Sequence, residues 1–366
     1  MASLTYTLDG NAGPSFEDFV HSKHFTQAFE NALLDKGDDE LDVTGNSGSV
    51  DFQVIDHDFE VYSKGGHDGA YVSNYAGADG IDHGLDDAGL ILYNTDLDGV
   101  TLELDGKIAH SIGLTHGDDD ITVHGKQAQL IDGADGNDYI ETGKGNDKIF
   151  GGDGNDEVHA GQGNDTVDGG AGDDRLFGDR GNDSLVGGAG DNTIDGGCGF
   201  DVAQVLGSKA SYHYVGNEWS GNGNHITNTE FVKVSDGVLI TVGSPDEGAL
   251  ARLFQAINNA DPTLTDYKNA LSALQNNHSL EDIAKNLIDP VNGHDDLSGG
   301  TNSQFVNHLL DNMFDGTAGR PDAGWVNDYV SHLDSSWSRA KIAADLVSQV
   351  DTADDHLGIH IDTTSH

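Results

Sequence analysis

The sequence predicts a β solenoid plus α fold, in which a parallel β-roll or β-helix is followed by a C-terminal helical bundle domain. Residues 133–204 repeat a nine-residue unit eight times without a gap, and the unit reads G-G-x-G-(N/D)-D-x-(I/V/L)-x. From about residue 246 apolar residues recur at helical spacing instead, and glycine is scarce between 249 and 290. A fixed repeat followed by helical periodicity indicates two or three domains in 366 residues.

The first six residues of each unit predict a turn, because glycine adopts backbone angles forbidden to other residues. Residues seven to nine predict a very short strand with one inward side chain. That inward position carries Ile140, Ile149, Val158, Val167, Leu176, Leu185 and Ile194, and the smaller Ala203 in the last unit. Two nonapeptides then form one coil of a flattened solenoid.

Stacking coils of eighteen residues aligns the acidic sixth position of alternate units along two edges. One edge carries Asp138, Asp156, Asp174 and Asn192, and the other carries Asp147, Asp165, Asp183 and Asp201. The turn carbonyls are those of Gly136, Gly145, Gly154, Gly163, Gly172, Gly181 and Gly190. Calcium takes six to eight oxygen ligands, so one turn supplies only part of a set and two turns must share each ion. We therefore expect several Ca²⁺ ions along both edges, with the weakest sites in the last coil because Asn192 carries less charge.

This nonapeptide resembles the repeat-in-toxin (RTX) unit, which implies a calcium-binding β-roll. The alternative is a flexible linker, since glycine and aspartate alone suggest disorder. A linker needs neither a nine-residue period nor a fixed apolar position. The repeats contain sixteen Asp and Glu residues against four Lys and Arg residues, and the acidic side chains repel one another. Without calcium, this segment can therefore behave as a flexible linker.

The flanking segments are less regular. We expect residues 1–36 to form an N-terminal cap with a helix over 14–35, and 37–132 to form an irregular β-solenoid that keeps fragments of the repeat. Residues 205–245 contain short strand patterns that predict closing strands. The stretch NTEFVKVSDGVL within them resembles the closing unit that follows RTX arrays.

Residues 246–352 predict a helical domain, with Ser or Thr before several apolar stretches as plausible caps. Residues 305–350 resemble a helical domain of unknown function found in secreted and S-layer proteins. The matching features are Phe305, Leu309, GRPDAG at 319–324, Trp325, Tyr329, Leu333, Ser338 and Arg339, with a weaker copy over 250–288. The resemblance implies an architectural context and no chemistry. Residues 353–366 form a tail.

The formal charge of −47 predicts repulsion from nucleic acid and from anionic membrane surfaces. No stretch is long and apolar enough for a membrane span, and no classical signal peptide is expected. RTX context implies export by a type I system to the exterior or cell surface of a Gram-negative bacterium, with the tail as a candidate export signal. Cys198 is the only cysteine, which predicts no internal disulfide.

No H-E-x-x-H or G-x-S-x-G motif occurs, so the sequence favours a non-enzymatic role. We predict a secreted calcium-binding structural protein that folds on calcium and takes part in a surface layer, extracellular matrix or adhesion assembly. Its partners would be calcium and either further copies of itself or anionic envelope polysaccharide bridged by calcium. The alternatives are a secreted enzyme or accessory domain acting on polysaccharide, and an RTX toxin-like effector.

Overall fold

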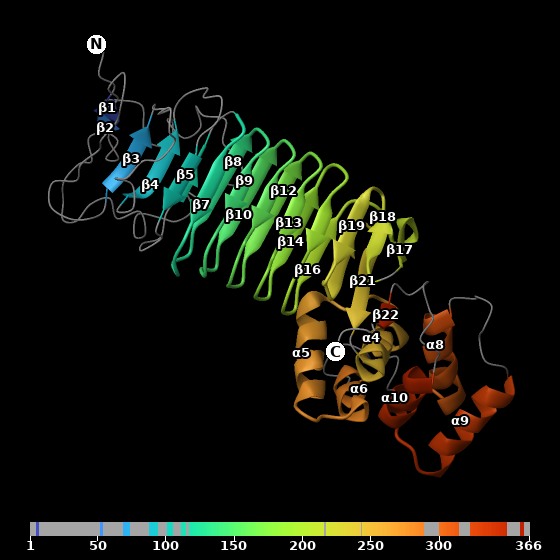
Figure 1. The fold of residues 1–366 in the computed structure, drawn as a ribbon. Helices are drawn as coiled ribbons and strands as arrows, with labels where there is room; N and C mark the ends of the chain where they lie inside the picture. Colours follow the sequence, from blue (N-terminus) through green and yellow to red (C-terminus); the bar gives the residue numbers. More distant parts are fainter. Residues whose placement is uncertain are drawn as a thin grey trace. The chain divides into compact units, whose positions relative to one another are not determined.

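The computed structural model describes residues 101–104, 111–114, 117–215, 217–242, 244–288, 300–314 and 323–349, with short strands at 5–6, 52–53, 69–73, 88–93 and 359–361. The chain divides into two units. The solenoid unit comprises residues 1–207 and 218–229, and the helical unit comprises residues 208–217 and 230–366. Figure 1 shows the parallel strands of the first unit and the helices of the second.

Two sheets form the solenoid unit, and from β4 to β16 successive strands of the chain alternate between them. The first sheet contains β3 (Gly69–Ser73), β4 (Ala88–Tyr93), β6 (Ser111–Gly113), β8 (Leu130–Asp135), β10 (Lys148–Asp153), β12 (Thr166–Ala171), β14 (Ser184–Gly188) and β16 (Val202–Val205). The second contains β5 (Thr101–Leu104), β7 (Asp120–Val123), β9 (Tyr139–Glu141), β11 (Glu157–His159), β13 (Arg175–Phe177), β15 (Thr193–Asp195), β19 (Asn224–Thr227) and β18 (Trp219–Gly221). A separate short pair joins β1 (Thr5–Tyr6) to β2 (Phe52–Gln53).

The regular part of the stack advances by eighteen residues per coil. Ile149 pairs with Ile131 and with Val167 in the first sheet, and Val158 pairs with Ile140 and with Leu176 in the second. The inward residue of every unit from Ile140 to Ile194 is completely buried, and so is Ala203. The nine-residue period therefore produces two parallel sheets around one narrow apolar core, as the sequence predicts.

The C-terminal end of the second sheet is closed by a hairpin. β19 pairs in parallel with β15, and β18 then pairs with β19 in the antiparallel direction. Trp219 lies opposite Ile226, and both are buried. An antiparallel strand at this position ends the parallel ladder without leaving a long flat edge to pair with another chain.

The helical unit contains, among the residues that the structure describes, α4 (Pro245–Asn258), α5 (Leu264–Gln275), α6 (Leu280–Ile288), α8 (Asn302–Phe314), α9 (Ala323–Ser335) and α10 (Arg339–Gln349). Ser244 caps α4, where its hydroxyl accepts a hydrogen bond from Glu247 N at 3.3 Å. Thr263 caps α5 in the same way through Asp266 N at 3.2 Å. The predicted Ser and Thr caps are thus present at both of these helix starts.

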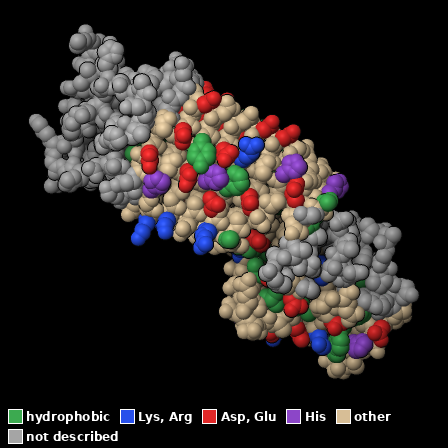
Figure 2. All heavy atoms as spheres, in the orientation of Figure 1, with side chains coloured by type: hydrophobic (Ala, Val, Ile, Leu, Met, Phe, Trp, Pro, Cys, Tyr) green, Lys and Arg blue, Asp and Glu red, His purple; other side chains and the backbone are tan. Residues whose placement is uncertain are grey.

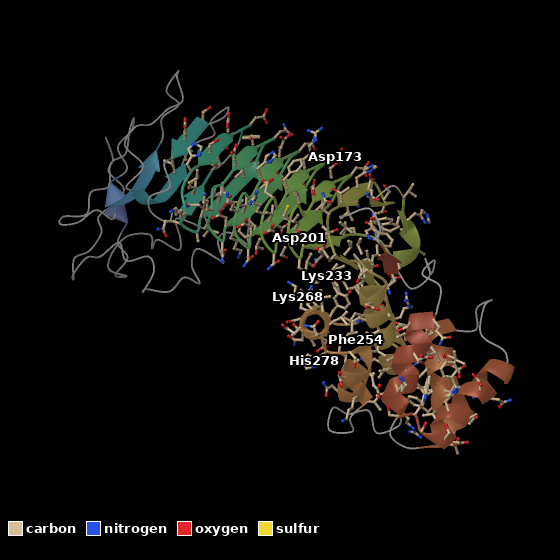
Figure 3. All side chains as sticks on the ribbon, turned by 60° about the horizontal axis from the view of Figure 1, so that its bottom comes forward. Asp173, Asp201, Lys233, Phe254, Lys268 and His278 are labelled. Carbon is tan, nitrogen blue, oxygen red and sulfur yellow. The ribbon has the colours of Figure 1, made fainter. Side chains whose placement is uncertain are left out.

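Helix α4 is the centre of this unit and packs against α6, α8 and α10. Its buried face carries Leu250, Leu253 and Phe254, the last of which is labelled in Figure 3. Two buried polar side chains fix neighbouring helices to it. Arg252 Nε donates to Val347 O at 3.0 Å, and Asn312 Nδ2 donates to Ala256 O at 2.8 Å.

The helical unit also contains η2 (Lys209–Ser211), β17 (Tyr212–Tyr214), and the paired strands β20 (Phe231–Val234), β21 (Gly237–Val242) and β22 (Ile359–Ile361). No helix in the described part of the chain is both long and apolar enough to cross a membrane. The predicted cap helix over 14–35, most of the 37–100 segment, Trp325 and most of the tail lie outside the residues described in detail. The proposed domain boundaries stay predictions.

Candidate metal centre

The aspartates at position six of the repeat form two continuous ladders, one along each edge of the roll. Each carboxylate Oδ1 accepts the backbone N–H of the equivalent residue one coil earlier, as when Asp138 N donates to Asp156 Oδ1 at 2.9 Å. The first edge continues through Asp174 and Asn192, and the second edge contains Asp147, Asp165, Asp183 and Asp201. Figure 3 labels Asp201 on the second edge and Asp173 on the first. The backbone bond fixes each carboxylate and turns its other oxygen inward.

The second oxygen, Oδ2, points at the glycine that begins the same turn. A Cβ added to Gly169 would lie 2.5 Å from Asp174 Oδ2 and 3.1 Å from Gly187 O. A Cβ added to Gly178 would lie 2.6 Å from both Asp183 Oδ2 and Gly196 O. Each of these two glycines at position one therefore faces a space lined by a carboxylate oxygen and a carbonyl oxygen of the next coil. We call this arrangement the oxygen cradle.

The same cradle occurs at Gly133 with Asp138 and at Gly151 with Asp156. The carboxylates are almost completely buried, and Oδ2 makes no hydrogen bond to the described chain at Asp138, Asp156, Asp165, Asp174 and Asp183. An unsatisfied buried carboxylate oxygen is costly unless a cation or a proton satisfies it. The cradle is therefore a place that demands a positive charge.

Burial gives these carboxyl groups strongly raised pKa values when no metal ion is present. Desolvation raises the pKa of Asp138 and of Asp165 to about 8, and that of Asp156 to about 7. It raises the pKa of Asp174 and of Asp183 to about 6. In each case the backbone N–H that bonds to Oδ1 acts in the opposite direction and is the weaker influence. Ionisation of these groups in the folded chain is therefore unfavourable unless a cation lies next to them.

The carboxylates are distributed one per turn rather than gathered into clusters. In the described part of the chain no group of three or more His, Cys, Asp or Glu side chains converges on one metal-sized point. A hard cation with six to eight oxygen ligands therefore has to draw most of them from backbone carbonyls of adjacent turns. The cradle supplies both kinds of oxygen, so the donor set fits calcium and does not resemble the nitrogen and sulfur sites of zinc.

The two edges differ at position one. The second edge has Thr142 and Ala160 where the first edge has glycine, so a Cβ is already present beside Asp147 and Asp165. Thr142 also donates its hydroxyl hydrogen to Ala160 O at 2.7 Å. Complete cradles thus occur at three turns of the first edge and, within the repeats, at one turn of the second that ends in Asp183.

The last coil departs from the pattern. A Cβ on Gly187 would meet Asn192 Nδ2 at 3.0 Å, where other turns present a carboxylate oxygen. The same amide nitrogen donates to Asn224 Oδ1 at 3.2 Å, so Asn192 is held by the closing hairpin. An amide N–H cannot ligate a cation. This geometry supports the expectation that the last coil holds its ions most weakly.

A second pair of ladders lies outside the aspartates and was not predicted. The side chain at position five accepts the backbone N–H of the equivalent residue one coil later, as when Asn155 N donates to Asn137 Oδ1 at 2.9 Å. The series continues at Asp173 and Asp191 on the first edge and at Asn164, Asn182 and Phe200 on the second. The signal was the Asn or Asp that the repeat keeps at position five.

The glycines at position four have a packing role in the structure. Gly136, Gly154 and Gly172 have φ angles of 141°, 143° and 140°, which disfavour any other residue. A Cβ on Gly172 would lie 1.8 Å from the carbonyl oxygen of Gly154 in the preceding coil. That the carbonyls of these glycines and the side chains of the aspartates bind calcium stays a prediction. The carbonyls that face Oδ2 belong to position one, which is not among the predicted ligands.

The repeats match a known family model. Residues 132–167 and 168–203 each match the RTX calcium-binding nonapeptide repeat, a model of four copies. This segment is an RTX β-roll. Calcium is the ion that this repeat family binds. No curated protein and no solved structure matches the chain.

The β-roll thus combines a repeat family that binds calcium with buried aspartates whose inner oxygens face glycine. RTX repeats are typical of secreted bacterial proteins, and their domains are typically structural or calcium-binding. The ladders explain why one short unit suffices. Each turn holds the carboxylate of the next in place, and the same geometry recurs every eighteen residues.

Proposed function

We propose that the protein is a secreted structural protein that folds on calcium outside the cell and takes part in a surface layer, matrix or adhesion assembly. The observation that carries the proposal is the pair of buried aspartate ladders. The interior carboxylates stack on others of the same charge, and at four turns Oδ2 lines an open oxygen cradle. Close stacking of charges becomes favourable only when cations lie between them.

Calcium gives this arrangement a compartment-dependent switch. Binding free energy is folding free energy when a site does not exist in the unfolded chain. Sites too weak to fill in the cytosol, where calcium is scarce, would leave the chain loose for export by a type I system of a Gram-negative bacterium. The same sites would fill outside the cell, and the roll would form there.

A structural role is supported by the uniformity of the roll. Successive coils place equivalent turn positions in line along each edge, so the surface repeats along the axis, which suits a repeating partner such as another copy or an envelope polymer. The helical unit adds a second module, and its sequence resembles helical domains found in S-layer proteins. Ions on the acidic surface would then bridge protomers or anionic polysaccharide.

Calcium titration of the full-length protein tests the proposal. Far-ultraviolet circular dichroism would follow strand formation, light scattering would follow particle size, and electron microscopy would show whether the particles are regular. We expect strand signal to appear with calcium, followed by sheets or filaments that chelator dissolves. Magnesium at equal ionic strength is the control, because it demands stricter geometry and should give much less structure.

A compact calcium-loaded monomer that never associates, over the whole accessible range of protein concentration, would refute the assembly role. In that case envelope polysaccharides become the next candidate partners, and turnover of such polymers by the protein would favour the enzymatic alternative.

A further inference from the structure

The second edge of the β-roll carries a column of exposed cations. Position three of its turns is occupied by Lys144, Gln162, Arg180 and Cys198, one in each coil, and Lys126 precedes them at the same spacing. The backbone fixes this alignment, because each of these residues from Lys144 onward donates its N–H to the preceding coil in the same way. All five side chains are exposed. Three of the five Lys and Arg between residues 117 and 205 therefore lie on one line.

The cations of this column form no ion pair with the part of the chain that the structure describes. Among the described residues, no ion pair is found for Lys126, Lys144 or Arg180, whereas Arg175 on the sheet face pairs with Glu157 at 3.5 Å. A chain with 17 basic and 64 acidic residues has many carboxylates available nearby. An unneutralised line of positive charge in such a protein is a surface that attracts an anionic partner.

The first edge carries acidic residues, one in each successive coil. The acidic residues there are Asp118, Asp135, Asp153, Asp173 and Asp191, one per coil, at position three or position five of the turn. Asp135 is half-buried and the other four are exposed. Figure 2 shows Asp and Glu side chains along the upper border of the solenoid and a row of Lys and Arg side chains along its lower border.

Both columns belong to one stack of parallel strands, so both repeat at the strand spacing of about 4.8 Å. Two rolls laid side by side would therefore keep their charges in step over the whole length of the edge. Contact between like edges brings equal charges together, which is unfavourable. Contact between unlike edges places a carboxylate near a cation in successive coils.

We propose that the second edge docks on the first edge of another copy of this chain. The contact is heterologous, because the two surfaces are different patches, and a heterologous contact that does not close extends into an open row. The proposal rests on the proposed function and deepens it, since it names the contact through which protomers would associate. Exposed ion pairs are individually weak, so the contact should depend on their number and on salt concentration.

A charge exchange between the edges tests this contact in the full-length protein. The first variant combines Lys126→Asp, Lys144→Asp and Arg180→Asp, and Asp already occupies this turn position at Asp153. The second variant combines Asp153→Lys, Ala171→Lys, Ala189→Lys, Asp173→Asn and Asp191→Asn. Lys144 and Asn155 show that these residue types fit the turn, and Asn at position five preserves the ladder.

We expect each variant alone to remain monomeric in calcium at protein concentrations at least tenfold above those at which the wild type assembles. An equal mixture should assemble again, because one variant has two acidic edges and the other has two basic edges. The matched control, Lys148→Asp with Arg175→Asp and Lys285→Asp, changes net charge by the same amount as the first variant. It should assemble like the wild type, since none of its positions lies on the second edge.

Disulfide trapping gives an independent readout of the same contact. The wild type has a single cysteine, the exposed Cys198 on the second edge, so oxidation can link at most two copies. Ala189→Cys adds a cysteine to the first edge, and we expect a ladder of products longer than dimers on a non-reducing gel in calcium. Lys285→Cys on α6 is the control and should give far fewer of these products.

The outcomes separate the two proposals. Assembly of the first variant at the wild-type concentration, or failure of the mixture to assemble, would overturn the edge contact while leaving the surface-assembly role standing. A wild type that never assembles would overturn both. If the Asp variant lacks strand signal in calcium, Lys126→Gln with Lys144→Gln and Arg180→Gln repeats the test with the residue that the column already has at Gln162. This variant should assemble several-fold less readily than the wild type, and equal assembly would refute the contact.

Discussion

The first edge of the β-roll begins each of its turns with glycine, whereas the second edge begins two of its four turns with Thr142 and Ala160. Both edges carry an aspartate ladder, and the backbone N–H bonds to the Asp Oδ1 atoms measure 2.9 and 3.0 Å on the first edge and 2.7 to 2.8 Å on the second. Only the first edge keeps an open oxygen cradle at successive turns. The comparison teaches that the aspartate fixes where an ion can bind, while the residue at position one decides how much room the ion has.

Removing calcium should have the largest effect. In excess chelator we expect the roll to lose most of its strand signal, because buried carboxylates would face one another without cations. Amide hydrogen exchange at residues 139–195 would measure this loss. At intermediate free calcium, the second edge should lose protection before the first. Equal protection with and without calcium would contradict the role given to the ladders.

Replacing one aspartate on each edge should sharpen the difference between them. Asp156→Asn and Asp165→Asn both keep the Oδ1 acceptor, so neither leaves a buried backbone N–H unsatisfied at a cost of about 1–3 kcal/mol. Both lose the charged Oδ2, as Asn192 does naturally. We expect Asp156→Asn to weaken calcium binding by about tenfold or more, a typical loss on disturbing a metal site. Asp165→Asn should weaken it less.

Isothermal titration calorimetry with wild type and both variants would give the affinities and the number of ions. A larger loss for Asp165→Asn than for Asp156→Asn would reverse the ranking of the edges and refute the importance of the glycine at position one.

Exchanging the residue at position one should give a smaller but more direct effect. Gly151→Ala adds a Cβ that would lie 2.6 Å from Gly169 O and even closer to Asp156 Oδ2, and the φ angle of Gly151 is not in the left-handed region. We therefore expect weaker calcium binding and a local shift of the Gly169 carbonyl, although the φ angle itself suits alanine. Ala160→Gly on the second edge is the reciprocal change and should strengthen binding there. Calorimetry would measure the calcium affinity of both variants. If both substitutions changed the affinity in the same direction, the residue at position one would not explain the difference between the edges.

Much of this fold follows from the nine-residue period. A stack of equal coils places every eighteenth residue in line, so the two aspartate columns and the buried Ile149 and Val158 could be predicted. The position-five ladders could not, because the direction of a turn N–H depends on backbone angles that the pattern does not specify. The effect of Thr142 and Ala160 on the ion sites could not be predicted either, because the sequence does not show that Oδ2 faces position one.

The end of the roll was less predictable than its middle. Short strands were expected over 205–245, but the closing hairpin places Asn224 beside Asn192 across 32 residues of chain. No repeat period connects those positions, because the chain enters the helical unit at Ser208 and returns at Glu218. The helices were predictable individually from their apolar spacing, while the buried contact of Arg252 with Val347 O required the fold.

Acidity should compensate in part for missing calcium, and this is the smallest effect expected. The folded-state pKa values of about 6 to 8 lie above the ordinary value of 3.8 for aspartate. A raised pKa in the folded state contributes stability that is fully present below the unfolded pKa and is lost as pH rises through the folded pKa. In chelator, strand signal should therefore be greater near pH 5 than near pH 8.

Both edges should show this pH dependence, and bound calcium should remove it. Asp138 and Asp156 on the first edge hold pKa values of about 8 and 7, and Asp165 and Asp183 on the second hold about 8 and 6. Protonation can therefore neutralise the carboxylates of either edge, whereas the open oxygen cradle that suits calcium occurs at more turns of the first edge. Circular dichroism from pH 5 to pH 8, with and without calcium, measures this pH dependence.

Asp156→Asn and Asp165→Asn should then reduce the calcium-free pH dependence by similar amounts while differing in calcium affinity. Unequal loss of pH dependence would mean that the edges differ in burial rather than in room for the ion.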